Sequence, residues 1–269
     1  MILAEYFAGT RAIRRPLARA VIAIMNPLAR LDRKPADNAA ALRSLWPVVE
    51  AAHTESGDLA RRFYDEERAS RGMARHDTYR SVIKPEWFGE ALTPVLIETS
   101  EPAQDGAEQA RQTELVTAAA IAVVDSGGRR TMLRATETDR ELAGWARVEG
   151  GAESCAFCTM LISRGPVYSS ADSAGLDSDD ESAKELAEAY QRTGDRSELD
   201  SLMKRFHVRC DCQVVPVFDR ADWPGIDQYR AAEAAWIKAS KAAREAGTDP
   251  MTALRYQLDG RAVPAKEKK

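Results

Sequence analysis

The residues best suited to chemistry are four cysteines and one histidine in the second half of the chain. Cys155 and Cys158 form a C-x-x-C pair, and His207, Cys210 and Cys212 form an H-x-x-C-x-C cluster. Zinc takes four tetrahedral nitrogen or sulfur ligands, and two closely spaced cysteines supply one edge of that tetrahedron. The two clusters therefore predict a structural zinc site. Five candidates exist for four places, and we favour four thiolates, with His207 beside the site or substituting for Cys212.

Buried thiols, disulfides and a redox C-x-x-C remain alternatives to zinc. Between Cys158 and Cys210 lie 51 residues, more than in a common zinc ribbon, and this lowers the specificity of the motif. A reducing compartment argues against disulfides, and a redox pair does not explain the second cluster. Four thiolates would leave zinc no open position for water, so the expected role is structural.

A second motif, Asp125-Ser126-Gly127-Gly128, matches four letters of a serine-protease nucleophile loop. A serine nucleophile needs a positioned base. The chain has three histidines, and His207 already belongs to the cysteine cluster. We therefore expect no catalytic residue, and we expect Gly127 and Gly128 to cap the end of a buried helix.

Composition indicates a helix-rich protein with thin contacts. Alanine supplies 46 of the 269 residues, and 38 basic against 42 acidic side chains give a net charge of −4. That balance argues against a general nucleic-acid coat protein. The longest apolar run is far shorter than the roughly 20 residues of a membrane helix, and no targeting signal is evident. We expect a cytoplasmic site of synthesis and a predominantly α-helical α+β fold.

Residues 1–34 carry a net charge of +5 and an amphipathic pattern. The apolar face consists of Ile13, Leu17, Val21 and Ile24, and another face carries Arg11, Arg15 and Arg19. Such a pattern is typical of a helix that packs on its own domain. A membrane-surface helix or a helix for an anionic partner is the alternative. Since few large side chains are available to hold it, we predict that this segment is a docking element.

The remaining periodicity predicts further helices and one strand. Helical segments over 36–98 are expected to break at Pro47, Gly57, Gly72 and Pro85. A polar break at Glu101–Gly106 is the best candidate domain boundary, and a buried helix and a charged helix over 129–148 are expected after it. An acidic stretch over 172–200, net −7, is expected to be a solvated face. A strand over 212–218 and a long helix from Ile226 to Ala243 complete the expected order.

Four segments together resemble the Mu F-like minor head proteins of tailed phages, in the form common among phages of actinobacteria. The segments are Gly144–Val148, Cys155–Cys158, Ser163–Tyr168 and His207–Cys212. The short apolar strand Val214–Val217, with its proline, fits the same pattern. The specific resemblance covers roughly residues 130–218, and the helical first half fits only by order and size.

The resemblance implies a structural virion component of low copy number that docks near the portal and assists head assembly and DNA passage. It implies the portal or major capsid protein as partner, packaged DNA as a further one, and neither a membrane nor a small-molecule substrate. The expected regions are a helical docking region (1–100), a Mu F-like module with a Cys/His zinc staple and short strands (107–218), and a helix with a charged tail (219–269).

Two alternatives to a structural role remain. Similar proteins are often labelled capsid maturation proteases, and proximity of Ser126 and His207 in the fold would favour that activity. A zinc-stabilised DNA-binding module would instead be favoured by a basic face made of Arg129, Arg130, Arg134, Arg205 and Arg209. The overall charge of −4 argues against extensive DNA contact but allows a local patch.

Overall fold

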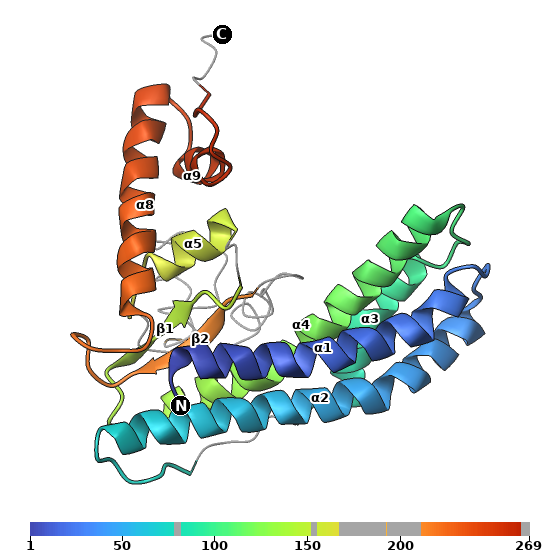
Figure 1. Ribbon diagram of the computed structural model, residues 1–269, viewed down its shortest axis with the longest axis horizontal. Coiled ribbons are helices and arrows are strands. Elements are labelled where there is room, and N and C mark those ends of the chain that lie inside the picture. The colour runs from blue at the N-terminus through green and yellow to red at the C-terminus, as the bar shows by residue number, and fades with distance from the viewer. Residues whose placement is uncertain (78–81, 152–154, 167–191, 193–210, 265–269) are drawn as a thin grey trace. The chain divides into compact units, whose positions relative to one another are not determined.

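The computed structural model describes residues 1–77, 82–151, 155–166, 192 and 211–264, which fall into two compact units. The first unit runs from Met1 to Ala135, and the second begins at Thr136. The described residues are predominantly helical, with one two-stranded antiparallel sheet. This confirms the predominantly helical class (Figure 1). The chain divides after Ala135, and Glu101–Gly106 lies inside the first unit. The assignment of the three predicted regions to their roles stays a prediction.

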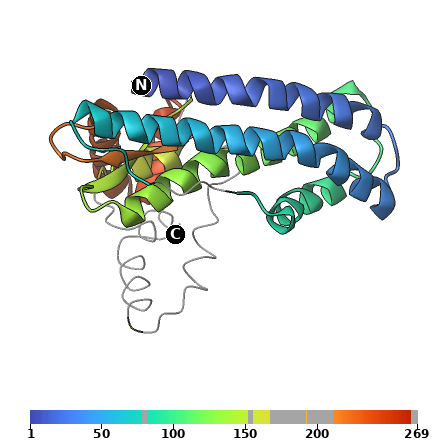
Figure 2. The same cartoon turned by 90° about the horizontal axis from the view of Figure 1, so that it is seen from below.

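The first unit is built from long helices. Helices α1 (Leu3–Leu28) and α2 (Pro35–Ser70) lie side by side along most of their length in both views (Figures 1 and 2). Helix α3 (Pro85–Glu98) contacts α2, and α4 (Gly106–Thr138) passes from the first unit into the second at its last three residues. No described helix is long and apolar enough to cross a membrane.

The apolar face of α1 belongs to the core of the first unit. Ile13, Leu17, Val21 and Met25 are buried, while Ile24, predicted for this face, is only half-buried. Each large aliphatic side chain contributes about 1.5–3 kcal/mol when it is fully buried. Helices of the same chain therefore hold α1 in place, in agreement with the usual meaning of an amphipathic helix. Deleting residues 1–34 would remove part of this core.

Two of the four expected helix breaks were wrong. Gly72 follows the end of α2 and Pro85 begins α3, as predicted, but α2 continues through Pro47 and Gly57. Burial of Leu45 and Val49, on either side of Pro47, offsets the hydrogen bond that proline cannot donate. At Gly57 a Cβ would lie 3.1 Å from Thr131 Oγ1 of α4, so this glycine allows two helices to approach closely.

The expected helix end at Gly127 and Gly128 was also wrong, because α4 runs through both residues to Thr138. A Cβ on Gly127 would lie 2.4 Å from the His53 carbonyl oxygen of α2. The Gly128 amide donates to Ser56 Oγ at 3.2 Å. These glycines thus serve a close helix crossing rather than a cap. The separate helix predicted over 129–148 does not exist, since its last five residues form a strand.

The second unit is organised around that strand. Strand β1 (Gly144–Val148) pairs antiparallel with β2 (Gln213–Val217), and Trp145 lies opposite Pro216. The predicted strand over 212–218 is thereby confirmed. Every residue of both strands is buried, and an isolated pair of strands is at best marginally stable in water. Neighbouring parts of the unit must therefore cover the sheet.

Three helices of the second unit pack on one another, and one of them contacts the sheet. Helix α5 (Ala156–Ile162) contacts β1, α8 (Ile226–Ala246) and α9 (Pro250–Leu258), and α8 contacts α9. Helix α8 confirms the long helix predicted from Ile226, whereas α9 was not predicted. Gly225 precedes α8 with a φ of 98°, and a Cβ there would lie 2.2 Å from a methyl group of Val148. Glycine is therefore required where the chain passes this strand.

Candidate functional site

Three of the five predicted zinc ligands lie in the described part of the second unit. Cys155 is the N-cap residue of α5, Cys158 lies in the first turn of α5, and Cys212 directly precedes β2. None of the three forms a disulfide. His207 and Cys210 lie outside the described residues. Cys212 directly precedes β2, and β2 pairs with β1. Since α5 follows β1 in the chain, this pairing brings Cys212 toward the segment that carries Cys155 and Cys158.

Cys158 and Cys212 pack against each other in one buried cluster. Their residues are only 3% and 1% exposed, whereas Cys155 is exposed. The Cys158 amide donates to Cys155 Sγ at 3.4 Å, and Arg147 Nη1 of β1 donates to Cys212 Sγ at 3.6 Å. The fold therefore gathers sulfur atoms from two segments that are more than 50 residues apart in sequence.

These thiols are of the chemical type that zinc binds, because paired cysteines and a third thiolate are common zinc donors. Arg147 places a guanidinium N–H beside Cys212 Sγ. Within the described ranges, no three or more His, Cys, Asp or Glu side chains are arranged to hold a metal ion. The zinc site therefore stays a prediction whose remaining ligands would come from His207 and Cys210.

The first unit contains a buried ion cluster that the motif analysis did not find. Arg14 of α1 binds Asp125 of α4 through two hydrogen bonds, Nε to Oδ1 at 2.9 Å and Nη2 to Oδ2 at 2.6 Å. Arg129 lies one turn further along α4, with its Nη2 3.8 Å from Asp125 Oδ2. The side chains of Asp125 and Arg129 are each 2% exposed. Because Arg14 and Asp125 are 111 positions apart in the sequence, no local pattern could reveal the pair.

Two buried ionisable groups in the first unit are held in their neutral forms. Burial, together with the Asp125 carboxylate, raises the pKa of the Tyr6 hydroxyl above its ordinary value. Burial, reinforced by the positive charge of Arg130, lowers the pKa of His53 to about 4. The Nδ1 atom of His53 is buried without a hydrogen-bond partner. A buried, neutral imidazole therefore lies at the contact between α2 and Gly127.

Ser126 lies inside α4, where its hydroxyl donates to the Val123 carbonyl at 2.7 Å. A protease nucleophile loop instead exposes its serine on a strained turn. The resemblance of Asp125–Gly128 to such a loop is therefore confined to the sequence letters. Proximity of Ser126 to His207, which would have favoured a protease, concerns a residue outside the described part of the chain.

Arg129, the first of the five arginines suggested for the basic face of a DNA-binding module, does not lie on the surface. Arg129 is buried against Asp125, and Arg130 lies over the ring of Trp87, with 4.2 Å between the guanidinium carbon and the ring centroid. Arg134 is exposed. Arg205 and Arg209 lie outside the described residues.

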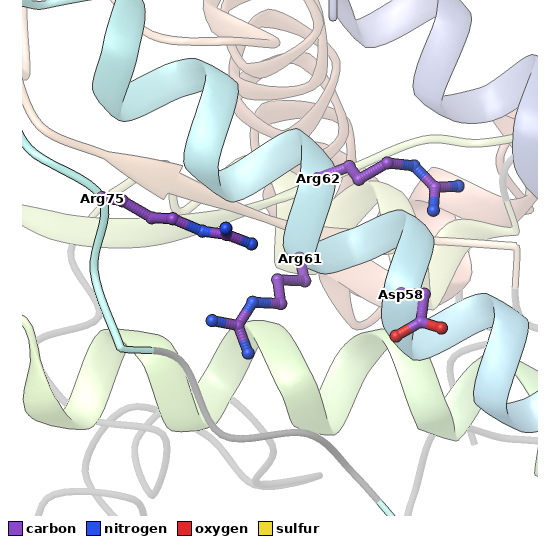
Figure 3. A pocket seen from close by; sticks show the side chains of 4 residues that line it. All are labelled: Asp58, Arg61, Arg62 and Arg75. Carbon is purple, nitrogen blue, oxygen red and sulfur yellow. The ribbon is translucent and has the colours of Figure 1, made fainter.

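A hollow lies beside the C-terminal part of α2. It has a volume of about 530 Å³ and is lined by Asp58, Arg61, Arg62 and Arg75. Figure 3 shows the guanidinium groups of Arg61 and Arg75 turned toward each other, while Arg62 extends to the other side of the helix. Arg75 Nε lies 2.8 Å and Arg61 Nε 3.8 Å from Asp65 Oδ2. Because both guanidinium groups are paired with Asp65, the hollow is not a formed anion site.

Comparison with known proteins gives consistent matches to phage sequences. A family model described as VG15 protein matches residues 2–239. The gene 15 protein of Mycobacterium phage D29 is 38% identical over 215 residues, covering 76% of this chain and 75% of that protein. The gene 15 protein of Mycobacterium phage L5 is 34% identical over 243 residues, covering 81% of each. No solved structure matches the chain.

Proposed function

Because the chain belongs to the VG15 protein family, and is thus a phage protein, we propose that it is a structural minor head protein of a tailed-phage virion. In this proposal it resides in the phage head, passes through the host cytoplasm during assembly, and docks near the portal. It assists head assembly and the passage of DNA.

One structural observation carries the proposal beyond the family match. The resemblance to Mu F-like minor head proteins rests on two parts of the sequence, one beginning at Gly144 and the other ending at Val217. In the fold, Gly144 lies directly opposite Val217 in the paired strands. Cys158 of the first part packs against Cys212 of the second. The described residues of the two parts thus belong to one folded unit, as expected if the resemblance reflects a common module.

A structural zinc ion is the second element of the proposal. It would be held by Cys155, Cys158, Cys210 and Cys212, with His207 beside it or in place of Cys212. The buried contact between Cys158 and Cys212 and the guanidinium of Arg147 support this ligand set. The ion would join α5 to β2 and so stabilise a sheet of only two strands. No enzymatic step is assigned to it.

A structural role fits the observations better than the two alternatives. Ser126 bonds to its own helix, which gives no support to a capsid maturation protease. Arg129 is buried in an ion pair, which removes a member of the basic face suggested for a DNA-binding zinc module. The proposed partners are therefore the portal protein and the major capsid protein, with packaged DNA as a further ligand.

Affinity capture tests the docking proposal. The full chain carries a tag and is co-expressed separately with the portal protein and with the major capsid protein of the phage that encodes it. We expect retention of portal rings through washes at moderate salt. Capture of the major capsid protein alone would move the docking position away from the portal. Capture of neither would contradict docking.

A further inference from the structure

The outward face of α1 carries a row of three arginines. Arg11, Arg15 and Arg19 are all exposed and follow one another at intervals of four residues, so they lie on one side of the helix. In the part of the chain that the structure describes, no ion pair or hydrogen bond joins any of them to another group. The opposite side of the helix is buried in the first unit.

This row differs from most other arginines of the first unit, which have partners of their own. Arg14 binds Asp125, Arg75 binds Asp65, and Arg130 covers Trp87. Like charges four residues apart destabilise a helix by a few tenths of a kcal/mol per pair. Glu5 is the single acidic residue in α1, and it lies at the start of the helix, where it accepts a hydrogen bond from the Ile2 amide. The helix therefore keeps three uncompensated charges together.

The surface between these arginines is smooth and has no anchor for a protein partner. The exposed residues that separate them, Ala12 and Pro16, are small. Protein interfaces centre on aromatic or large apolar side chains. None is exposed between Arg11 and Arg19, and the nearest on this helix, Ile22, is a single aliphatic side chain that is 40% exposed. Binding to a nucleic-acid backbone requires only cations that reach phosphates. Successive arginines are about 6 Å apart along the helix axis, and duplex DNA offers one negative charge per roughly 1.7 Å of its own axis.

We propose that Arg11, Arg15 and Arg19 on the exposed face of α1 bind the phosphate backbone of double-stranded DNA without sequence preference. The site deepens the proposed function, since packaged DNA is the ligand a head protein would meet. A DNA contact at this site is compatible with the net charge of −4, because the three cations are concentrated on one helix and the contact is local.

Fluorescence anisotropy with a labelled random duplex of about 20 bp tests the site directly. Full-length protein is titrated at several salt concentrations. Substituting all three arginines with glutamine (R11Q/R15Q/R19Q) should weaken binding at least about tenfold near 100 mM salt. The slope of log affinity against log salt should become shallower by about 2.7, which corresponds to three lost phosphate contacts. A lysine triple variant (R11K/R15K/R19K) should retain binding.

A matched control removes three equally exposed cations from α8. Lys238, Lys241 and Arg244 also face solvent without a described ion pair. The K238Q/K241Q/R244Q variant loses the same net charge and should bind DNA as the unaltered protein does. Equal losses in both triple variants would show an effect of bulk charge and overturn the proposal.

Two further outcomes would also overturn the proposed site. In the first, the glutamine variant keeps the full affinity and salt slope. In the second, the unaltered protein does not bind DNA but binds a polyglutamate peptide through the same arginines, which would identify an acidic protein as the partner. The proposed function is tested separately by portal capture and by particle composition. If the protein is found in heads but its R11Q/R15Q/R19Q variant still binds DNA normally, the DNA site on α1 is refuted and the proposed function is not.

Discussion

At the scale of single residues, the buried Asp125 carboxylate pairs with two arginines of the first unit, the partly buried Arg14 and the buried Arg129. Replacing Asp125 with asparagine keeps the shape but leaves Arg14 and Arg129 without their carboxylate. Removing one partner of a buried ion pair typically costs about 3–5 kcal/mol. We therefore expect Asp125→Asn to lower the free energy of unfolding by a comparable amount, measured by urea denaturation followed with circular dichroism.

The matched control is Asp227→Asn on α8. Asp227 lies 3.5 Å from Arg230, and its side chain is 93% exposed. Exposed ion pairs contribute little to stability, so this variant should unfold at nearly the urea concentration of the unaltered protein. Similar midpoints for both variants would mean that the buried carboxylate does not stabilise the first unit.

His53 gives the first unit a defined dependence on pH. Its pKa is about 4 in the folded protein, against about 6.5 in an unfolded chain. The unfolded state therefore binds more protons between these values, and stability falls as the pH is lowered through this window. Above pH 6.5 the His53 imidazole is neutral in both the folded and the unfolded state, so its titration removes no stability there. The loss approaches about 1.4 kcal/mol per pH unit in the middle of the window.

The His53→Phe variant removes this titration. Urea unfolding at pH 7 and pH 5 should show a clear loss of stability for the unaltered protein and a smaller loss for the variant. Equal losses in the two proteins would show that groups other than His53 govern the response to acid. Both proteins should be insensitive to pH between 7 and 8, which provides an internal control.

At the scale of elements, the contact between α2 and α4 depends on a glycine. A methyl group on Gly127 would meet the His53 carbonyl oxygen at 2.4 Å, and backbone cannot move aside as a flexible side chain can. Overpacking of this kind typically costs about 1–3 kcal/mol. We expect Gly127→Ala to lower the melting temperature, measured by calorimetry, although alanine favours a helix.

Gly89 of α3 supplies the opposite case for comparison. Nothing lies within 4 Å of the Cβ position there, so Gly89→Ala should raise the free energy of unfolding by about 0.5–1 kcal/mol through helix propensity alone. If Gly127→Ala stabilised the protein as Gly89→Ala does, the close crossing of α2 and α4 would be refuted.

The same elements show where sequence reasoning succeeds and where it stops. The buried face of α1 and the strand β2 were predicted because periodicity and β-branched residues act locally. Gly127 and Pro47 were misinterpreted because their effect depends on helices distant in sequence, which hold α4 and α2 continuous. Strand β1 was taken for helix because all five residues are buried and show no alternation. The partner of Arg14 could not be predicted for the same reason of distance.

At the scale of the whole molecule, zinc is the predicted link within the second unit. Purified protein should contain about one zinc ion per chain, measured by plasma mass spectrometry. Cys158→Ser should lose the metal and destabilise chiefly the second unit. Met160→Leu on the same helix changes a half-buried side chain that is not a ligand candidate, and it should retain the metal. Metal-free protein with fully reactive thiols, or native disulfides, would contradict the zinc site.

If this chain is a structural component of the phage head, purified particles must contain it. Quantitative mass spectrometry of DNA-filled heads, calibrated against the portal protein, measures the copy number per particle. We expect a few copies of the chain for each portal ring, retained after washing at high salt. Heads that contain portal and major capsid protein but none of this chain would show that it is not a head component.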